Sequence, residues 1–461
     1  HTLLKSVDVD VVVFERSPRA GGNIRTEVRD GYTCEWGPNG FLDSSPPTLD
    51  LVRELGLGDR LQVGDDSARR RYIVRGLRLH EVPTGPVSLL RSGLLSWPAK
   101  ARLAWEPFAA SRPAGDETIH AFAARRIGGE AADMLIDPMV SGVFGGDAHA
   151  LSLRACFPAM WQMETDHGGL VRALVARRKR SRDKANGIGA PTGRLTSFAG
   201  GLDVLVRTLA DRLGHVVRTS AGVEAVVRTG TGAYRLLCED GRTEVADAVV
   251  MAGGSAQTAR IVRDFDRPLA AVLDEMPTAS MVVACLGFSE SQLPRPLDGF
   301  GYLIPRIEGL RTLGCVWDSI VFPGRAPKGH VLMRVMMGGA SDPTAVTLDD
   351  DRVLAVVRKD LRTILGIDSA PSFVRLIRHR TGIPQYTVGH RDRVATAEAR
   401  LARHPGLFLA GNAYRGVSIN ACIADARNFG DAVGRERQRR FITRHQPRGR
   451  IKNGVDGFPS A

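Results

Sequence analysis

The sequence predicts an α/β protein of two or three domains, one of them assembled from both ends of the chain. The 461 residues are too many for one simple core. Residues 7–15 (VDVDVVVFE) first alternate and then become fully apolar, as in a parallel strand buried on both faces. Residues 406–412 (GLFLAGN) form a similar strand, and a helical pattern follows at 420–433. Strand–helix units at both ends therefore indicate one nucleotide-binding, Rossmann-like domain built from separated segments.

The composition is that of a soluble globular protein, with 43% apolar and 25% charged residues. No apolar run reaches the roughly 18 residues of a membrane span, and the first residues show no signal-peptide pattern. The six cysteines are scattered without a C-x-x-C pair. They predict a reducing compartment, no disulfide framework and no structural zinc, and a buried small hydrophobe is the favoured interpretation of each.

The formal net charge of +13 is partly local, in the basic runs 177–184 and 435–452. These runs have little aromatic interleaving and no nucleic-acid module signature, so we expect no nucleic-acid partner. A solvated loop and a disordered tail are the simplest interpretation. Contact with an anionic membrane surface is the functional alternative.

The elements between the two ends follow from hydrophobic periodicity and turn residues. We expect the end of a helix at 1–6, helices at 46–56, 58–63, 201–213 and 349–365, and a mostly helical stretch from about 83 to 180. A loop is expected at 187–198. Strands are expected at 215–219, 222–229, 233–238, 244–251, 281–288, 300–304, 312–319 and 331–337.

The first candidate site follows the strand 7–15. An acid at this place, Glu15, can accept hydrogen bonds from ribose hydroxyls. Arg19, Gly21 and Gly22 then form a turn where bare backbone can approach phosphate or ribityl oxygens. A solvated glutamate in a surface turn is the alternative, and the motif alone favours it. The first strand and G-x-G-x-x-G turn of such a unit are absent, so we expect a fragment lacking them.

Three further stretches carry candidate chemistry. EWGPNGFL (35–42) contains a Gly-Pro turn that could carry a loop under a ligand. RRRYIVRG (69–76) sets arginines, the usual partners of carboxylates, before a short strand, although spacing alone favours a solvated Arg71. At 408–426 a turn leads into a helix that starts near Ser418–Asn420, which suits phosphate or an anionic reduced flavin. The alternative is an ordinary turn capped by Asn420. No nucleophile or metal motif appears.

Together these stretches resemble the FAD-dependent protoporphyrinogen oxidases, members of the flavin amine oxidase and phytoene desaturase superfamily. The first and last motifs, VVVFERSPRAGGNIRT and LFLAGNAYRGVSINACI, are those of the superfamily. GPNGFL, RRYIVRG, SGVFGGD and GIPQYTVGH point to the porphyrinogen oxidases. The resemblance covers residues 1 to about 435 and leaves out the basic tail 436–461.

The resemblance implies a division into domains and a set of site residues. An FAD-binding domain would comprise 1–65, 195–262 and 398–435; a helical membrane-associating domain 72–180; and a sheet-rich substrate-binding domain 263–397. The cofactor would be bound by Glu15, Arg19, Gly21, Gly22, Gly37, Pro38, Asn39, Val223, Gly411, Val417, Ser418 and Ile419. The substrate would be bound by Arg71, which would pair with a propionate, and by the apolar wall of Gly142, Leu303, Val316 and Met336.

The implied reaction is the oxidation of protoporphyrinogen IX to protoporphyrin IX in haem biosynthesis. Hydride would pass to flavin N5 in three two-electron steps, with O₂ as the acceptor and no acid–base residue or metal. Coproporphyrinogen III oxidation, another amine oxidase or desaturase activity, and an inactive flavin-free fragment are the alternatives. The resemblance also implies a peripheral place on the cytoplasmic face of a membrane and is compatible with a homodimer.

Overall fold

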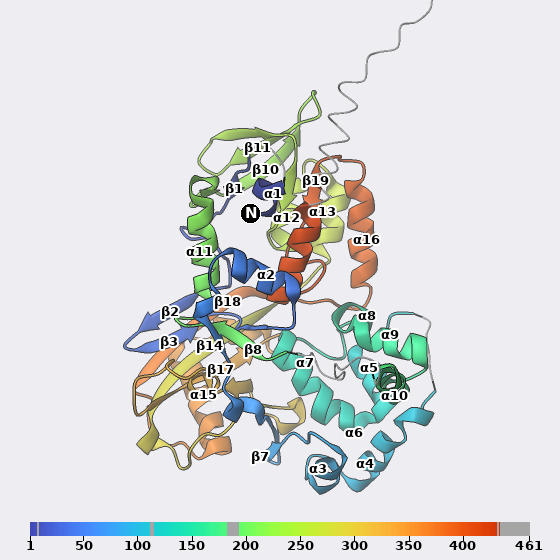
Figure 1. Cartoon of the computed structure of the whole chain (residues 1–461), viewed down its shortest axis with the longest axis vertical. Coiled ribbons are helices and arrows are strands. Elements are labelled where there is room, and N and C mark those ends of the chain that lie inside the picture. Colours follow the sequence, from blue (N-terminus) through green and yellow to red (C-terminus); the bar gives the residue numbers. More distant parts are fainter. Residues whose placement is uncertain (7–8, 111–114, 182–192, 431–432, 434–461) are drawn as a thin grey trace, which may run out of the picture.

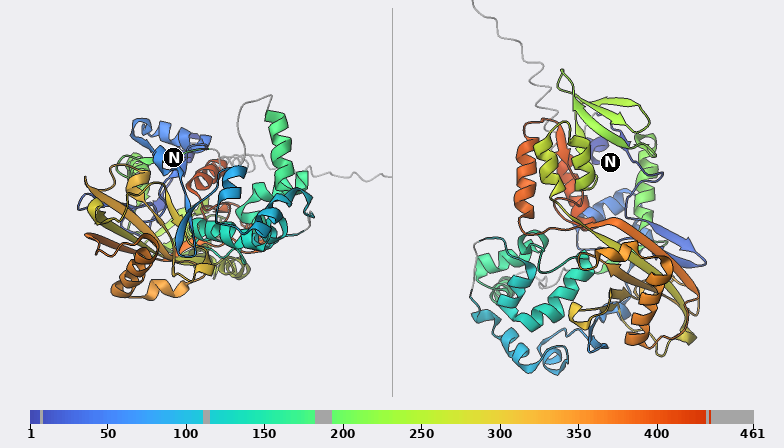
Figure 2. Two further views of the ribbon diagram at one scale, coloured as in Figure 1. Left: turned by 90° about the horizontal axis from the view of Figure 1, so that it is seen from below. Right: turned by 180° about the vertical axis from the view of Figure 1, so that it is seen from behind.

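The chain folds into three parts, and the computed structural model describes residues 1–6, 9–110, 115–181, 193–430 and 433. One part combines the two ends of the chain, a second is built on a large sheet, and a third is helical (Figure 1). The views from below and behind show the same three parts (Figure 2). The tail 436–461 and the side chains of the run 177–184 lie outside the described residues.

The first part contains parallel strand pairs from distant segments. β1 (Val13–Phe14) pairs with β9 (Val217–Arg218), and β13 (Val249–Met251) pairs with β19 (Leu407–Leu409). An antiparallel ribbon of β10 (Val223–Arg228), β11 (Tyr234–Cys238) and β12 (Thr243–Ala246) lies beside them (Figure 1). The helices of this part are α1 (Thr2–Ser6), α2 (Pro46–Glu54), α11 (Asp203–Leu213), α12 (Ser255–Val262), α13 (Arg267–Asp274) and α16 (His390–Leu401). The structure thus brings strands from both ends of the chain into one part.

Two helices of this part come from the region assigned to substrate binding. Leu269 and Leu273 of α13 and Val394 and Leu401 of α16 are buried in one core with β13 and β19. Helix α13 contacts both α12 and α16, so the apolar faces of these helices pack together in this core. The structure thus places residues 267–274 and 390–397 of the segment 263–397 with the two ends of the chain.

The second part is a seven-stranded sheet in which neighbouring strands are often far apart in the sequence. The strand order is β18-β14-β17-β16-β15-β6-β7. The strands are β6 (Tyr72–Arg75), β7 (Arg78–Glu81), β14 (Thr278–Ser289), β15 (Gly301–Leu303), β16 (Thr312–Val316), β17 (His330–Gly338) and β18 (Phe373–Pro384). Helix α15 (Asp350–Leu365) covers one face through Val353, Val357 and Leu361. The hairpin β2–β3 (Thr26–Arg29, Tyr32–Glu35) covers part of the other through Tyr32 and Cys34.

The third part is helical, as the sequence predicts for residues 83 to 180. Its helices are α3 (Pro86–Arg91), α4 (Trp97–Ala104), α5 (Ile119–Ile127), α6 (Gly129–Ala131), α7 (Asp137–Phe144), α8 (Leu153–Cys156), α9 (Pro158–His167) and α10 (Leu170–Ser181). A π-helical turn, Ala132–Ile136, precedes α7. No helix among the described residues is long and apolar enough to cross a membrane.

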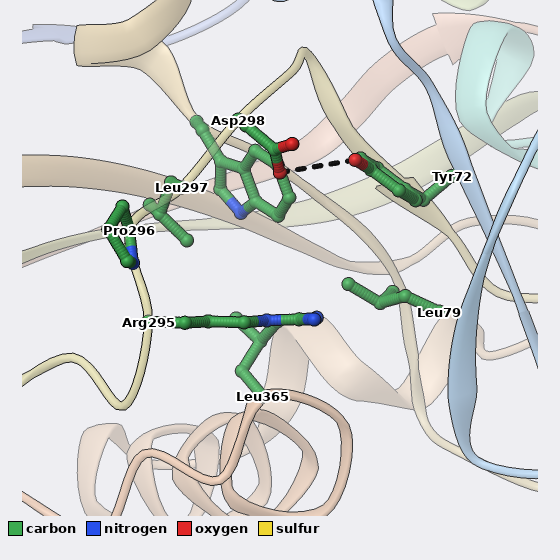
Figure 3. A pocket seen from close by; sticks show the side chains of 8 residues that line it. Tyr72, Leu79, Arg295, Pro296, Leu297, Asp298 and Leu365 are labelled. Carbon is green, nitrogen blue, oxygen red and sulfur yellow. Dashed lines mark hydrogen bonds between the residues drawn. The ribbon is translucent and has the colours of Figure 1, made fainter.

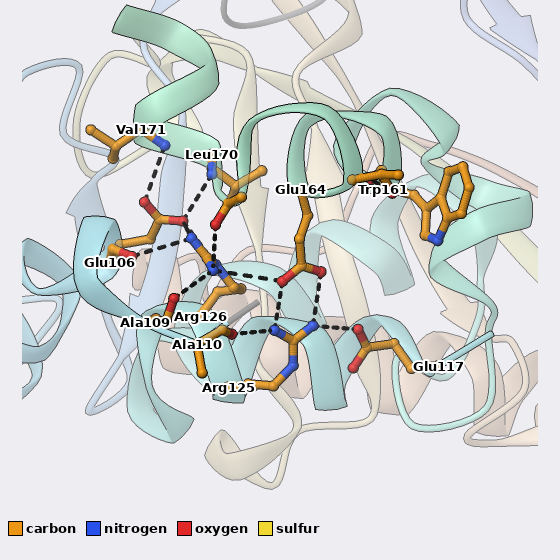
Figure 4. A network of polar contacts seen from close by, with 12 residues as sticks. Glu106, Ala109, Ala110, Glu117, Arg125, Arg126, Trp161, Glu164, Leu170 and Val171 are labelled. Atoms are coloured by element: carbon orange, nitrogen blue, oxygen red, sulfur yellow. Dashed lines mark hydrogen bonds and ion pairs between the residues drawn. The ribbon is translucent and has the colours of Figure 1, made fainter. Parts of the chain in front are cut away.

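A buried ion-pair network fixes the helices of this part (Figure 4). Arg126, fully buried, contacts Glu106, which also accepts the backbone N–H groups of Leu170 and Val171 at 2.9 and 3.1 Å. Arg125 donates to both carboxylate oxygens of Glu164 at 2.6 and 2.9 Å. Removing one partner of such a buried pair costs about 3–5 kcal/mol, so the network specifies how α5, α9 and α10 pack.

Several expected elements differ in the structure. Residues 58–63 do not form the expected helix. Gly58–Arg60 is a single 3₁₀ turn, and Leu61–Val63 forms β5, which pairs with β8 (Leu195–Phe198). The loop expected at 187–198 is therefore wrong over β8, and residues 187–192 lie outside the described range. The expected strand 244–251 is broken between β12 and β13, and the strand expected at 312–319 ends at Val316, where α14 (Asp318–Val321) follows. Of the strand expected at 7–15, residues 7–8 lie outside the described range, and within 9–15 only Val13–Phe14 forms a strand.

Candidate cofactor and substrate site

Glu15 and Val223 lie at neighbouring strand ends. The backbone carbonyl of Glu15 accepts a hydrogen bond from the Ala221 N–H at 2.9 Å, two residues before Val223. The Glu15 carboxylate accepts the N–H of Ser17 at 2.8 Å through one oxygen, and the side chain is partly exposed. The structure thus brings together the two residues that the sequence assigns to the adenosine end of the cofactor.

The glycine turn after β1 is held by Arg19. Its guanidinium donates to the carbonyls of Gly22 and Ile24 at 3.1 and 2.7 Å and pairs with Asp203 at 2.6 Å. Gly21 has φ +109°, and a Cβ there would lie 2.4 Å from Val206 Cγ1. Only glycine therefore fits this close approach to α11. The Arg19 side chain shapes the turn, so a ligand here would meet mainly backbone.

The segment 37–39 is fixed by contacts on both sides. A Cβ on Gly37 would lie 2.4 Å from the Asn23 carbonyl oxygen, so glycine is required for the approach to the first turn. Asn39 is buried, donates to Asp318 at 3.0 Å and accepts from Arg325. The Asn39 side chain therefore anchors the segment and is not free to bind a ligand.

A buried charge network under this segment has no sequence signal beyond the motif EWGPNGFL. Arg334 donates to the Gly37 carbonyl at 2.7 Å and pairs with Asp318 at 3.1 Å. Arg325 pairs with Glu35 at 3.1 Å. Burial raises the pKa of Glu35, and Arg325 opposes that shift. These long-range partners converge from β3, β17 and α14, which a local pattern cannot reveal.

The turn 411–418 joins β19 to a helix over 419–430. Gly411 has φ +99°, and a Cβ there would lie 3.1 Å from the Ala252 carbonyl oxygen. The Ser418 hydroxyl accepts the Ala421 N–H at 3.2 Å and so caps the helix. The alternative of Asn420 as the cap is wrong. Its side chain instead accepts from Thr48 at 2.7 Å and donates to the Leu42 carbonyl at 2.9 Å.

These segments converge as a cofactor site would require. Ile24 after the glycine turn and Ile419 at the helix start pack in one apolar cluster. Asn420 ties the helix start to the strand that follows residues 37–39. Val417 packs against a cluster of the helical part that includes Phe144. Glycine-lined backbone, a helix N-terminus and a ribose-type acid are the groups that a flavin dinucleotide calls for.

The apolar residues predicted to bind the substrate share one face of the large sheet. Leu303 lies opposite Gly314 on β16, and Gly314 lies opposite Met336 on β17. Val316 is two residues from Gly314 and therefore points to the same side. Gly142 of α7 meets this face, since a Cβ there would lie 2.5 Å from Leu303 Cδ2. The four wall residues are thus brought together, on the face that also carries Arg334.

Arg71 lies next to this wall, directly before β6. Ile73 pairs with Leu303, and strand alternation puts Arg71 on the same face. Its guanidinium carbon is 5.5 Å from the ring centre of Phe300, which packs with Val316 and Met336. Arg71 is exposed and makes no ion pair or side-chain hydrogen bond with the described residues. It is therefore available to an anionic ligand.

Two small cavities lie away from this wall. One, of about 50 Å³, is lined by Tyr72, Trp317 and Leu365 on the α15 side of the sheet (Figure 3). The other, of about 40 Å³, is apolar and lies among the helices. Each holds no more than a few waters. Neither is large enough for a cofactor or a macrocycle.

The cysteines are free, and burial keeps the two nearest the turn protonated. Burial raises the pKa of Cys422 to about 11 and that of Cys156 to about 12. A thiol of this kind is a poor nucleophile at neutral pH. Cys34, Cys238, Cys285 and Cys315 are buried, as expected of small hydrophobes.

One side-chain cluster among the described residues has the composition of a metal site. His120, Asp133 and His149 have ligand atoms within 4.8 Å of one another. The His120 Nε2 already bonds Asp133 at 2.7 Å, and the two imidazole rings stack at 3.7 Å. The cluster lies on the helical part, and no predicted cofactor residue belongs to it.

The fold and the site together define an oxidoreductase with a flavin dinucleotide cofactor. A family model described as flavin containing amine oxidoreductase matches residues 2–433, and the chain belongs to that family. The predicted flavin cofactor, FAD, is confirmed by this membership.

Relatives within this family are similar along most of their length. The coproporphyrinogen III oxidase of Bacillus subtilis is 30% identical, with 91% of this chain and 90% of the relative covered. The chloroplastic protoporphyrinogen oxidase of Nicotiana tabacum is 33% identical, covering 92% and 81%. A crystal structure of a candidate protoporphyrinogen oxidase from Exiguobacterium sp. 255-15 superposes with a TM-score of 0.80 at 27% identity, covering 93% and 94%. Cyclohexylamine oxidase from Brevibacterium oxydans, at 15% identity and TM-score 0.68, shares the fold.

Proposed function

We propose that this protein oxidises protoporphyrinogen IX to protoporphyrin IX with FAD and O₂, as a step of haem biosynthesis. The observation that carries the proposal is the sheet face where Arg71 lies beside Leu303, Val316 and Met336. A tetrapyrrole is an apolar macrocycle with acidic edges, so it calls for apolar walls and a free cation. Relatives named for this activity support it.

The residues of the chain would bind, orient and exclude water. Arg71 would hold one propionate while Leu303 and Gly142 bound the ring on one side. Bound FAD supplies the redox chemistry, accepting two electrons in each of three steps and passing them to O₂. The backbone of residues 21–22, 37–38 and 411–419 would hold it, with Glu15 at the ribose. Each two-electron oxidation would also release one proton from the porphyrinogen, and no residue of the predicted site is assigned to accept it.

Coproporphyrinogen III is the second candidate substrate. Two relatives of 30% and 32% identity are coproporphyrinogen III oxidases. That substrate has four propionates instead of two, so its binding calls for more cations along the wall than Arg71 alone. Turnover of the two porphyrinogens at equal concentration, followed by porphyrin fluorescence, distinguishes them. A higher kcat/KM for coproporphyrinogen III would overturn the first assignment.

The proposed function also assigns a role to each of the three parts of the protein. The part that combines the two chain ends would bind the cofactor, the seven-stranded sheet would supply most of the substrate wall, and the helical part, from α3 to α10, would rest on a membrane surface facing the cytoplasm. Residues 72–81 of the predicted helical domain 72–180 belong instead to the sheet, as β6 and β7. The support for the membrane contact is three large exposed aromatic side chains in and after α4: Trp97 (69% exposed), Trp105 (60%) and Phe108 (68%). Aromatic residues of this kind favour the membrane interface.

The primary test is the visible spectrum of the purified chain after addition of FAD and removal of the excess. A retained flavin band, followed by porphyrin formation from protoporphyrinogen IX, is the expected result. A chain that retains no flavin would contradict the proposed cofactor site. A flavin-loaded chain that oxidises an amine but no porphyrinogen would contradict the proposed substrate.

A further inference from the structure

The segment 385–390 (QYTVGH), between β18 and α16, contacts all three parts of the protein. The Gln385 side chain donates to the Phe144 carbonyl at the end of α7 at 2.8 Å. The Tyr386 carbonyl accepts the Ser152 N–H at 2.8 Å, and Thr387 forms a β-bridge with Leu151. These contacts lie on the helical part, whereas the backbone N–H of Gln385 bonds Pro277 beside β14. The segment is thus a junction, although its sequence carries no acid–base or metal motif.

The Tyr386 hydroxyl reaches from this junction into the turn 411–418. It donates to the Asn412 carbonyl at 2.6 Å and accepts the Gly416 N–H at 2.7 Å. Tyr386 is 3% exposed, and burial raises its pKa, so the hydroxyl stays protonated and can make both bonds. One side-chain oxygen therefore bridges the two ends of a five-residue stretch of the turn.

His390, the first residue of α16, contacts the same turn. Its ring stacks on Tyr386 with centres 3.9 Å apart and planes at 14°. Its Nε2 is 3.0 Å from the Tyr414 carbonyl, which can only accept, so Nε2 carries the proton. Tyr386 and His390 together bind three backbone groups of the turn, at residues 412, 414 and 416.

The contacts of the turn itself explain why such an anchor is needed. Gly416 has φ +148°, and a Cβ there would lie 2.4 Å from the Ala421 Cβ. The turn thus passes close over the first turn of the helix 419–430, whose N–H groups the proposed function directs at the flavin. A small rotation at Gly416 would move Val417 and Ser418 away from that path.

We propose that Tyr386 is a positioning residue that fixes the turn 411–418 for the cofactor, an inference that rests on the proposed function. It acts through the backbone of Asn412 and Gly416 and does not itself touch the substrate. Because the same segment binds Phe144 and Ser152, it also sets the turn relative to α7, which carries Gly142 against the substrate wall.

The test compares Tyr386→Phe with Tyr234→Phe. The first variant keeps the ring and its stack on His390 but loses both hydroxyl bonds. The second also loses a part-buried hydroxyl bond to a backbone carbonyl, that of Pro405 at 3.0 Å, which precedes β19 and is not a group of the turn 411–418. FAD is removed from each protein, and its Kd and visible spectrum are measured on rebinding, together with the Tm of each flavin-free chain.

We expect Tyr386→Phe to raise the Kd for FAD about tenfold or more and to shift the visible flavin bands. Tyr234→Phe should leave the Kd within about twofold of the wild type and the bands unchanged, even where its Tm falls as far. Equal Kd values and spectra in the two variants would overturn the inference. A wild-type chain that binds no FAD would overturn the proposed function as well, so the two failures are distinguishable.

Discussion

At the scale of single residues, several side chains of the candidate site bind backbone and leave the ligand to meet peptide groups. Arg19 donates to two carbonyls of the glycine turn, and Tyr386 bridges Asn412 and Gly416. Asn39 is engaged with Asp318 and Arg325. Substituting such residues should therefore change cofactor affinity and spectrum more than the chemistry of the bound flavin. Arg71 is different, because its guanidinium makes no hydrogen bond or ion pair with the described residues and contacts only the Phe300 ring.

Arg71→Ala tests the substrate side. A charge-assisted hydrogen bond contributes about 1.5–3 kcal/mol, so its loss should raise KM for the porphyrinogen about 10- to 100-fold. The rate of flavin reduction at saturating substrate should fall far less, because the wall still orients the ring. The matched control is Arg70→Ala, since Arg70 already pairs with Asp298 at 2.7 Å. An unchanged KM in Arg71→Ala with normal flavin content would count against the assignment.

His390 predicts a pH dependence of stability. Burial lowers the pKa of His390 from 6.5 to about 4, and the positive charge of Arg393 adds to this shift. The hydrogen bond to the Tyr414 carbonyl and the negative charge of Asp116 oppose it. Its Nδ1 is buried without a hydrogen-bond partner among the described residues, so a second proton would be unsatisfied. Below pH 6.5 the unfolded chain binds a proton that the folded chain refuses. Stability should therefore fall by up to about 1.4 kcal/mol per pH unit between pH 6.5 and about 4.

Urea unfolding of wild type and His390→Gln between pH 7 and 4.5 measures this effect. The free energy of unfolding of the variant should fall less steeply as the pH is lowered. The difference in slope should be up to that of one bound proton, about 1.4 kcal/mol per pH unit. The control is His215→Gln, an exposed histidine after α11, which should keep the wild-type slope. Parallel slopes for wild type and His390→Gln would show that the histidine titrates alike in both states.

At the scale of elements, the helix 419–430 depends on Ser418 as its cap. Ser418→Ala should destabilise the protein by about 1 kcal/mol, because one N–H of the first turn loses its acceptor. It should also weaken FAD binding if this N-terminus faces the flavin. Thr118→Ala removes the equivalent cap of α5, where Thr118 accepts from Ala121 at 3.1 Å. We expect a similar loss of stability but unchanged FAD affinity there; a Ser418→Ala protein with wild-type affinity would exclude this helix start from the site.

Elements were predictable where one pattern decides their structure. The long amphipathic α15 and the apolar β14 and β17 follow from period and length, and the structure confirms them. Residues 61–63 and 195–198 were not predictable, because each stretch is short and forms a strand through long-range pairing: β8 pairs with both β5 and β4 (Phe41–Leu42). The charged β18 (RLIRHRTG) was missed for a related reason. Its polar residues are tolerated because β18 is an edge strand beside β14.

The candidate site shows the same limit. Glycines with positive φ and the strand-end acid Glu15 leave a local signal, so Gly21, Gly22 and Gly411 could be found. The Arg334–Gly37 and Tyr386–Gly416 contacts join residues far apart in the chain, and only the fold brings them together. The motif GIPQYTVGH contains Tyr386 but does not indicate its contact with Gly416.

At the scale of the whole molecule, the aromatic end of the helical part lies opposite the part that combines the two chain ends. In Figure 1, α3 and α4 form the lower edge and β10 and β11 the upper one. Trp105 and Phe108 pack on each other with ring centres 4.9 Å apart yet stay mostly exposed. A surface placed against this edge would leave the cofactor part in water.

Trp105→Ser combined with Phe108→Ser tests this arrangement. Full burial of one large apolar side chain contributes about 1.5–3 kcal/mol, so the pair should lower binding to phosphatidylglycerol-containing vesicles at least tenfold. Val245→Ser with Ile307→Ser, which removes exposed apolar groups (64% and 73%) from other parts, should leave vesicle binding unchanged. Turnover in detergent should stay near the wild-type rate in both variants. Vesicle binding that survives the first pair would place the contact elsewhere, whereas equal losses in both pairs would show only general hydrophobic adsorption.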